Sequence, residues 1–161
     1  MPEIIPPPVQ LDPKTSKCYV CGPENPNGLH VVFQKHGEHG ARSTYTVLEE
    51  HCGWPGILHG GITFALMDEA LAWACYFQEL YGVTAKVESR FRQPLHVGDK
   101  LVILGWTTER HRRLVSARSE IHLDTDDGPL VAEADATMYL PDVQGEEAKS
   151  QDSGGRSQEK D

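Results

Sequence analysis

Long apolar runs, cysteines, aromatic residues and positive charge are all scarce in this 161-residue sequence. No apolar run approaches the roughly 18 residues that a bilayer-spanning helix requires, so we expect a protein that does not enter a membrane. Basic residues number 15 against 24 acidic ones, giving a net charge of −9. That charge argues against general binding of nucleic acid, because phosphate neutralisation needs a basic surface. The remaining composition is typical of one globular domain.

The four cysteines are too few and too unevenly spaced for the disulfide framework of a secreted protein. The first residues are rich in proline and lack a basic region followed by an apolar core, so we do not expect a secretory signal. A cytoplasmic location is the simplest expectation. Cys18 and Cys21 form a C-x-x-C pair, which is half of a zinc site or a redox couple, and Cys52 or a nearby histidine would have to complete a zinc site. We favour structural thiols, and expect no metal and no cofactor.

Composition divides the chain into three parts. Residues 1–28 hold Pro6-Pro7-Pro8 and the turn-forming run from Pro23 to Gly28, which predict an irregular N-terminal segment. Residues 29–141 carry the periodic patterns of a folded domain. Residues 142–161 contain almost nothing apolar, and we expect this acidic tail to be disordered.

Within the domain, periodicity predicts two strands, one helix and four more strands. The first strands, 29–35 and 41–47, flank a glycine-containing turn typical of a hairpin. The helix is expected over 60–80, with Gly82 at its carboxy-terminal cap. The later strands are expected at 84–91, 100–108, 114–123 and 130–140, joined by turns too short for crossover helices.

This order predicts an α+β fold in which a curved antiparallel sheet of about six strands wraps around one long central helix. The helix is apolar on almost every side, so it must be enclosed. Its exceptions include Asp68 and Glu69, two adjacent carboxylates. Burying a carboxylate is costly, and such a residue inside a helix of this kind indicates a functional site.

Several motifs together indicate a family. They are the run from Cys18 to Leu29 (CYVCGPENPNGL), His59-Gly60-Gly61, Leu66-Met67-Asp68, and the turn containing Pro94 and Gly98-Asp99. With them the chain resembles the hotdog-fold acyl-CoA thioesterases of the phenylacetate-pathway (PaaI-like) type, over about 18–140. The resemblance implies a hotdog fold and hydrolysis of acyl-CoA thioesters.

Thioester hydrolysis requires a polarised carbonyl and an attacking water, and the start of a helix offers unpaired N–H groups. Gly60 lies at such a start, and the resemblance implies that its amide binds the thioester oxygen. Asp68 follows eight residues later and can point into the same cavity, as general base or nucleophile. The resemblance also implies that Thr84, from a partner subunit, orients the water or the carboxylate. His59 is either catalytic or a backbone-bonding residue at the start of the helix.

Two neighbouring positions carry further expectations. Glu69 is displaced from Asp68 by about 100° around the helix, so we expect a structural role or a subunit contact. Gly53 stands where many relatives have Asn or Gln, a side chain thought to hold the water or the carbonyl. We therefore expect weaker or altered catalysis.

Substrate contacts are expected from Gly61, from Trp54, and from a basic cluster. Coenzyme A carries phosphates, and the basic residues gather around one hairpin turn and nearby strands. The alternative is a solvated turn whose charges favour solubility. The predicted phosphate-binding residues are Arg90, Arg92, Arg110, Arg112 and Arg113, with His111 and Arg118 beside them. The acyl group is expected along the helix, near Trp54, Phe64, Trp73 or Tyr76.

The sequence thus predicts an acyl-CoA thioesterase that acts as a homodimer or homotetramer. Two alternatives stay open at this point. One is a non-catalytic module that binds acyl-CoA or lipid. The other is an enoyl-CoA hydratase or dehydratase in which His51 is the base.

Overall fold

The computed structural model describes residues 17–141 of the chain. One α-helix, α1, spans Gly60–Tyr76, and a short 3-10 helix, η1, spans Glu49–His51. The strands are β1 (Gln34–His36), β2 (Gly40–Thr46), β3 (Cys52–Trp54), β4 (Ile57–Leu58), β5 (Val83–Phe91), β6 (Lys100–His111), β7 (Leu114–Leu123) and β8 (Leu130–Tyr139).

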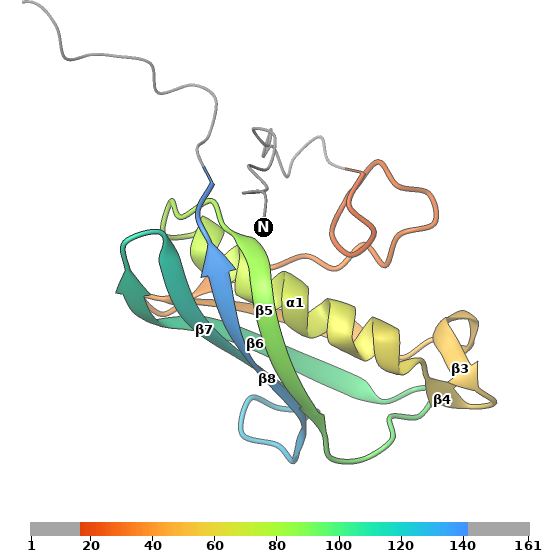
Figure 1. The fold of residues 1–161 in the computed structure, drawn as a ribbon. Coiled ribbons are helices and arrows are strands. Elements are labelled where there is room, and N and C mark those ends of the chain that lie inside the picture. The colour runs from red at the N-terminus through yellow and green to blue at the C-terminus, as the bar shows by residue number, and fades with distance from the viewer. Residues whose placement is uncertain (1–16, 142–161) are drawn as a thin grey trace, which may run out of the picture.

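Six of the strands form one antiparallel sheet in the order β1-β2-β6-β7-β8-β5, and β3 and β4 form a separate small hairpin. Helix α1 lies along one face of the sheet and packs mainly on β6 and β2, with the β3–β4 hairpin beside its start (Figure 1). The predicted α+β hotdog fold is therefore confirmed.

The side-chain pattern of the strands explains why the helix lies on this face. In β7 the alternate residues Val115, Ala117, Ser119 and Ile121 are buried. On β6, Gly105 allows backbone contact with the helix, because a Cβ at this position would lie 2.4 Å from the Ala70 carbonyl oxygen. Small residues on the sheet thus let a single helix approach closely and fill the core.

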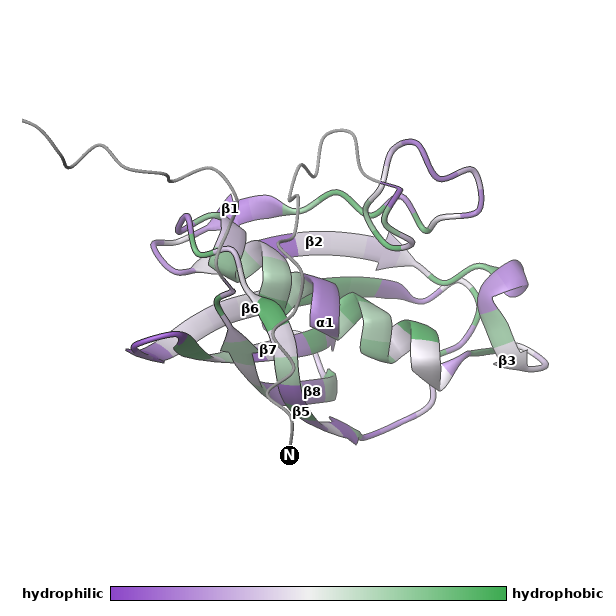
Figure 2. Cartoon of the chain, turned by 45° about the horizontal axis from the view of Figure 1, so that its top comes forward, coloured by the Kyte–Doolittle hydropathy of each residue, from purple (hydrophilic) through white to green (hydrophobic). Residues whose placement is uncertain are grey.

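Helix α1 is fully buried only on the side that faces the sheet. That side carries Leu66, Met67, Ala70, Leu71 and Ala74. The other positions are mostly half-buried, and a hydrophilic band interrupts the helix near its middle (Figure 2). The expectation of complete enclosure is therefore correct only for one side, and the helix has two flanks with different neighbours.

The helix ends earlier than predicted, at Tyr76 rather than near Leu80. The Gln78 side-chain amide donates to the Ala74 carbonyl oxygen at 2.7 Å, and Glu79 has a positive φ of 59°. These two features end the helix before Gly82, so the prediction that Gly82 is the cap was wrong. Side-chain capping of a last-turn carbonyl replaces the glycine that the sequence suggested.

The first strand is also shorter than predicted, because 29–33 bonds to a different segment. The amide of Leu29 donates to the Tyr19 carbonyl at 2.8 Å, and the amide of Val31 donates to the Val20 carbonyl at 2.9 Å. Residues 17–28 form irregular turns, yet Val20 is part of the main core. This segment is therefore built into the domain.

Residues 1–16 and 142–161 lie outside the described residues, so the predicted disorder of the acidic tail stays a prediction. Within 17–141, no helix combines the length and the hydropathy needed to cross a membrane.

Candidate active site

The start of α1 is capped by His59, which has extended backbone geometry. Its Nδ1 accepts from the Gly61 amide at 2.8 Å, and its carbonyl accepts from the amides of Ile62 and Thr63. In the part of the chain that the structure describes, the remaining first-turn amide, that of Gly60, has no acceptor. Gly60 is exposed, and nothing lies within 4 Å of where its Cβ would be. This N–H is therefore open to an incoming ligand.

The cap also determines what Gly61 and His59 do. Because the Gly61 amide already donates to His59, it is not an available donor for substrate. A Cβ on Gly61 would lie 3.0 Å from His59 Nδ1, so this glycine makes room for the capping ring. Since Nδ1 accepts, the neutral ring carries its proton on Nε2. The backbone-bonding interpretation of His59 is the one that this geometry supports.

Asp68 lies in the middle of α1 and contacts β5. The Thr84 hydroxyl donates to Asp68 Oδ1 at 2.7 Å, and Thr84 is the second residue of β5. The two residues predicted to act together are thus adjacent. The contact is made within one chain, so the expectation that Thr84 reaches Asp68 from a partner subunit was wrong. Strand β5 follows the helix directly and lies along its flank, which a sequence pattern does not reveal.

Gly60 and Asp68 of one chain lie too far apart along the helix to act together on one thioester. Eight residues at 1.5 Å each separate them by about 12 Å along the helix axis. An attacking water must lie about 3–3.5 Å from the thioester carbon whose oxygen the amide binds. The two groups of one helix therefore cannot both reach one thioester, and the prediction that they point into one cavity stays a prediction.

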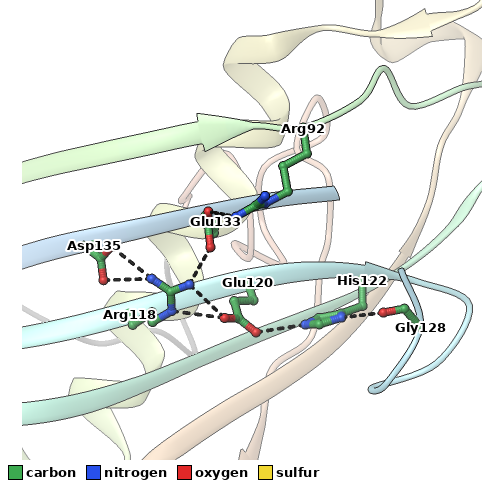
Figure 3. Close-up of polar contacts among 7 residues, drawn as sticks. All are labelled: Arg92, Arg118, Glu120, His122, Gly128, Glu133 and Asp135. Atoms are coloured by element: carbon green, nitrogen blue, oxygen red, sulfur yellow. Dashed lines mark hydrogen bonds and ion pairs between the residues drawn. The ribbon is translucent and has the colours of Figure 1, made fainter. Parts of the chain in front are cut away.

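The arginines predicted to bind phosphate fall into two groups, and the first is neutralised. Arg92 pairs with Glu133, and Arg118 contacts Glu120 and Asp135 at 3.0 Å and also Glu133, on the sheet surface opposite the helix (Figure 3). Burial acts to raise the pKa of Glu133, but hydrogen bonds from the two guanidinium groups outweigh it and hold that pKa below its ordinary value. Arg92 and Arg118 therefore form ion pairs on the sheet surface, and the role of Arg92 in phosphate binding stays a prediction.

The second group lies near Asp68. Cross-strand pairs connect Thr84 to Met138, Met138 to Val115, and Val115 to Arg110. Three strand spacings of about 4.8 Å place the Thr84 and Arg110 backbones roughly 14 Å apart. The β6–β7 hairpin at this end also holds Arg112 and Arg113, whose side chains are exposed. Arg90 lies six residues along β5 from Thr84, roughly 20 Å away, and belongs to the other end of the sheet.

Residues before the helix support the cap. His51 Nδ1 pairs with the Tyr45 hydroxyl, and the His51 carbonyl accepts from the His59 amide at 3.0 Å. These contacts connect His51 to β2 and to the start of the helix, and no observation favours it as the base of a hydratase. A Cβ on Gly53 would lie 3.1 Å from the His59 ring, so the absence of an Asn or Gln side chain here matches the position of His59. Trp54 is 78% exposed on the β3–β4 hairpin.

The opposite flank of α1 holds a cluster that the sequence did not predict. Glu69 lies beside Cys18 and Cys21, and Trp73 Nε1 donates to Glu69 Oε1 at 3.1 Å. Burial and the Glu69 carboxylate raise the pKa of the Cys21 thiol above its ordinary value. Cys52 lies elsewhere, with its thiol near the Leu48 carbonyl, so it does not complete a site with the other two. The third member of the cluster with Cys18 and Cys21 is Glu69, a residue that no spacing rule connects to the C-x-x-C pair.

Comparison with known proteins places this architecture among thioesterases. The family model described as the thioesterase superfamily matches residues 55–129. Acyl-coenzyme A thioesterase 13 of Mus musculus is 28% identical over 96 residues, which cover 58% of this chain and 68% of that protein. The PaaI protein from the phenylacetic acid degradation operon of E. coli has a TM-score of 0.64 and 25% identity, over 69% of this chain and 83% of that chain.

A crystal structure of another thioesterase superfamily protein has a TM-score of 0.70 and 25% identity over 78% of this chain. The match covers 60% of that chain, so this protein spans less than two thirds of that relative.

Proposed function

The chain is similar to members of the thioesterase superfamily, and from this similarity we propose that it hydrolyses acyl-CoA thioesters to the free acid and coenzyme A. The observation that carries the proposal is the Asp68 carboxylate, held by the Thr84 hydroxyl at 2.7 Å, on a helix that begins with an open Gly60 amide. A base and an N–H donor are the two groups that this reaction needs.

In the proposed reaction Asp68 activates water. Thr84 occupies Asp68 Oδ1, which leaves Oδ2 to accept a proton from water as the water oxygen bonds to the thioester carbon. The carbonyl electron pair moves to oxygen, where the Gly60 N–H stabilises the negative charge. The pair then returns, the C–S bond breaks, and coenzyme A leaves as a thiolate that takes up the proton.

In the proposed site, two chains contribute to each active site. Because about 12 Å separates them along one helix, Asp68 and Thr84 of one chain would act with Gly60 of a second chain. A homodimer is the smallest assembly with a complete site, and a homotetramer contains the same pairing twice. The division between the chains differs from the one that the sequence suggested, since Gly60 rather than Thr84 crosses the boundary.

The coenzyme A nucleotide is proposed to bind at the β6–β7 hairpin. Arg110, Arg112 and Arg113 lie at the end of the sheet that carries Thr84, and the roughly 14 Å between the Thr84 and Arg110 backbones suits the extended arm between the thioester and the phosphates. Arginine binds phosphate through paired N–H donors. Replacing all three with Gln is expected to raise KM for acyl-CoA more than it lowers kcat.

The test of activity is release of free thiol from a panel of acyl-CoA esters of different chain length and aromatic character. Purified wild-type protein is expected to release coenzyme A from at least one class. Binding of acyl-CoA by calorimetry without thiol release would instead indicate a non-catalytic module.

The test of the two-chain site is complementation between two inactive variants, D68N and G60P. In a mixed dimer, one site combines the intact Asp68 of one chain with the intact Gly60 of the other, so activity is expected to return. If both groups acted from the same chain, every site in the mixture would lack one of them and no activity would return.

A further inference from the structure

The flank of α1 opposite Asp68 carries three side chains with metal-ligand chemistry. A sulfur from Cys18, a sulfur from Cys21 and a carboxylate oxygen of Glu69 all lie within 4.8 Å of one another. All three residues are half-buried, and within 17–141 this is the only such group of three. We propose that this cluster binds one divalent transition-metal ion, zinc above all, through two thiolates and the carboxylate.

The distances are close to those that a bound ion would impose. Zinc binds sulfur at about 2.3 Å and carboxylate oxygen at about 2.0–2.2 Å, so tetrahedral ligands lie about 3.6–3.8 Å apart. Cys18 Sγ lies 3.7 Å from Glu69 Oε1 and 3.5 Å from Oε2. The Cys21 sulfur, within 4.8 Å of both, must move by about an ångström at most. A small closure of the loop therefore produces the site.

The loop that carries the cysteines is held in this conformation by its own backbone. The amide of Val20 donates to Cys18 Sγ at 3.4 Å, and the amide of Gly22 donates to the Cys18 carbonyl at 3.0 Å. An N–H donor directed at sulfur stabilises a thiolate ligand. The pairing of Tyr19 with Leu29 anchors the loop from outside. The two thiols are thus presented to the helix by a preorganised turn.

Glu69 is oriented by a partner that is not a ligand. Trp73, one turn further along α1, donates its indole N–H to Glu69 Oε1. Such outer contacts orient ligating carboxylates and strengthen metal binding. Both carboxylate oxygens face Cys18, so Glu69 supplies one or two donor atoms, and water completes the coordination.

A carboxylate beside two thiols distinguishes a metal site from a redox couple. Negative charge next to a thiol opposes the thiolate that disulfide exchange requires. A divalent cation reverses this effect, because it is attracted by all three groups as two thiol protons are released. The bound ion would attach residues 17–28 to α1 and stabilise the fold. Glu69 is turned about 100° from Asp68, so the ion would not contact the reacting thioester.

The test uses the full-length chain, stripped with a chelator under reducing conditions and titrated with Co²⁺. A single Co²⁺ per chain is expected, with thiolate charge-transfer absorption, and Zn²⁺ is expected to displace it and to raise Tm. Cys18→Ser and Cys21→Ser should each reduce the absorption, and the double replacement should abolish it. Glu69→Gln, which removes a ligand, should weaken binding by at least the roughly 10–100-fold that loss of an outer contact costs. Cys52→Ser is the matched control and should bind as the wild type does.

Three outcomes would overturn the proposal. The first is absence of thiolate absorption in the reduced wild-type protein with Co²⁺. The second is metal binding that survives replacement of both cysteines. The third is a reversible disulfide, seen as loss of two thiols in air that reduction restores, in protein that does not bind Zn²⁺. If a cysteine variant fails to fold, the Co²⁺ titration of the wild type with Zn²⁺ competition still decides, because it requires no variant. Thiol release from acyl-CoA is a separate measurement, so failure here leaves the proposed hydrolysis standing.

Discussion

The two flanks of α1 use adjacent carboxylates in different ways. Asp68 lies against β5 and accepts one hydrogen bond from the Thr84 hydroxyl. Glu69 lies against the 17–28 loop, between two thiols and an indole. A rotation of about 100° between consecutive residues places them in these two environments. Identical chemistry next to different neighbours thus separates a proposed catalytic group from a proposed structural one.

The neighbours explain the difference. Beside Asp68, the Thr84 hydroxyl bonds one carboxylate oxygen, so the second oxygen keeps its capacity to accept a proton. Beside Glu69, Cys18 and Trp73 contact both oxygens, and the loop covers the flank. Changes on the first flank should therefore affect turnover, and changes on the second should affect stability.

The largest expected effect is that of D68N. Asn keeps the size of the side chain and an oxygen for Thr84 but cannot accept the proton, so kcat should fall by about 10²–10⁴-fold with the fold intact. The matched variant is E69Q on the other flank, whose kcat should stay near that of the wild type. Thiol release and circular dichroism measure both. Equal losses in the two variants would contradict the division between the flanks.

The second effect concerns the Gly60 N–H at the start of the helix, which should matter for turnover and not for the Glu69 cluster. Proline is accepted at the first helical position, and the extended backbone of His59 (φ −61°, ψ 129°) suits a following proline. G60P therefore removes the open N–H while keeping the helix, and kcat should fall by about 10²–10³-fold. G60A, which keeps the N–H, is the control, and its chain should fold normally. A fully active G60P would exclude this amide as the donor.

The third prediction distinguishes the contribution of the Thr84 hydrogen bond from that of the side-chain volume. T84V has nearly the same shape but no donor for Asp68, and the loss of a hydrogen bond to a charged group should lower kcat by about tenfold or more. T84S keeps the hydroxyl and should retain most activity. The pair is compared by kcat and KM. Similar kinetics for the two variants would show that Thr84 only packs.

The fourth effect should appear in stability alone. W73F removes the indole donor to Glu69 and some volume, and should lower the free energy of unfolding by about 1–3 kcal/mol. W54F makes the same substitution at a side chain that is 78% exposed, and should change little. Urea denaturation measures both. If W73F lost kcat while its free energy of unfolding stayed at the wild-type value, the Glu69 flank would also affect turnover, and the division between the flanks would be contradicted.

The smallest effect lies on the sheet surface away from both flanks. Burial acts to lower the pKa of His122, but the Gly128 carbonyl and the Glu120 carboxylate outweigh it and raise that pKa above 6.5 (Figure 3). A raised pKa adds stability below pH 6.5 that is lost as the pH rises through the folded-state value. The difference in Tm between wild type and H122Q should therefore shrink with rising pH, while kcat stays the same. A difference independent of pH would refute this assignment.

The local sequence pattern was sufficient to predict an element where buried residues repeat with a regular period. The alternation of β7 predicted a half-buried strand, and the long apolar stretch after His59 predicted a helix that begins at Gly60. The end of the helix was missed because it depends on the Gln78 side chain, and residues 29–33 were missed as a strand because Leu29 and Val31 bond to the N-terminal loop. Both outcomes depend on a specific hydrogen-bond partner, which periodicity does not identify.

By itself the sequence determined the fold class, the position of Asp68 on the helix, and the angle between Asp68 and Glu69, because helix geometry is local and regular. The tertiary structure decided which neighbour each carboxylate has. It placed Thr84 beside Asp68 in the same chain, brought Cys18 and Cys21 to Glu69, and left the Gly60 amide open. It also paired Arg92 with Glu133, on the far side of the sheet. These are contacts between segments distant in sequence, and only the packing of helix, sheet and loop brings them together.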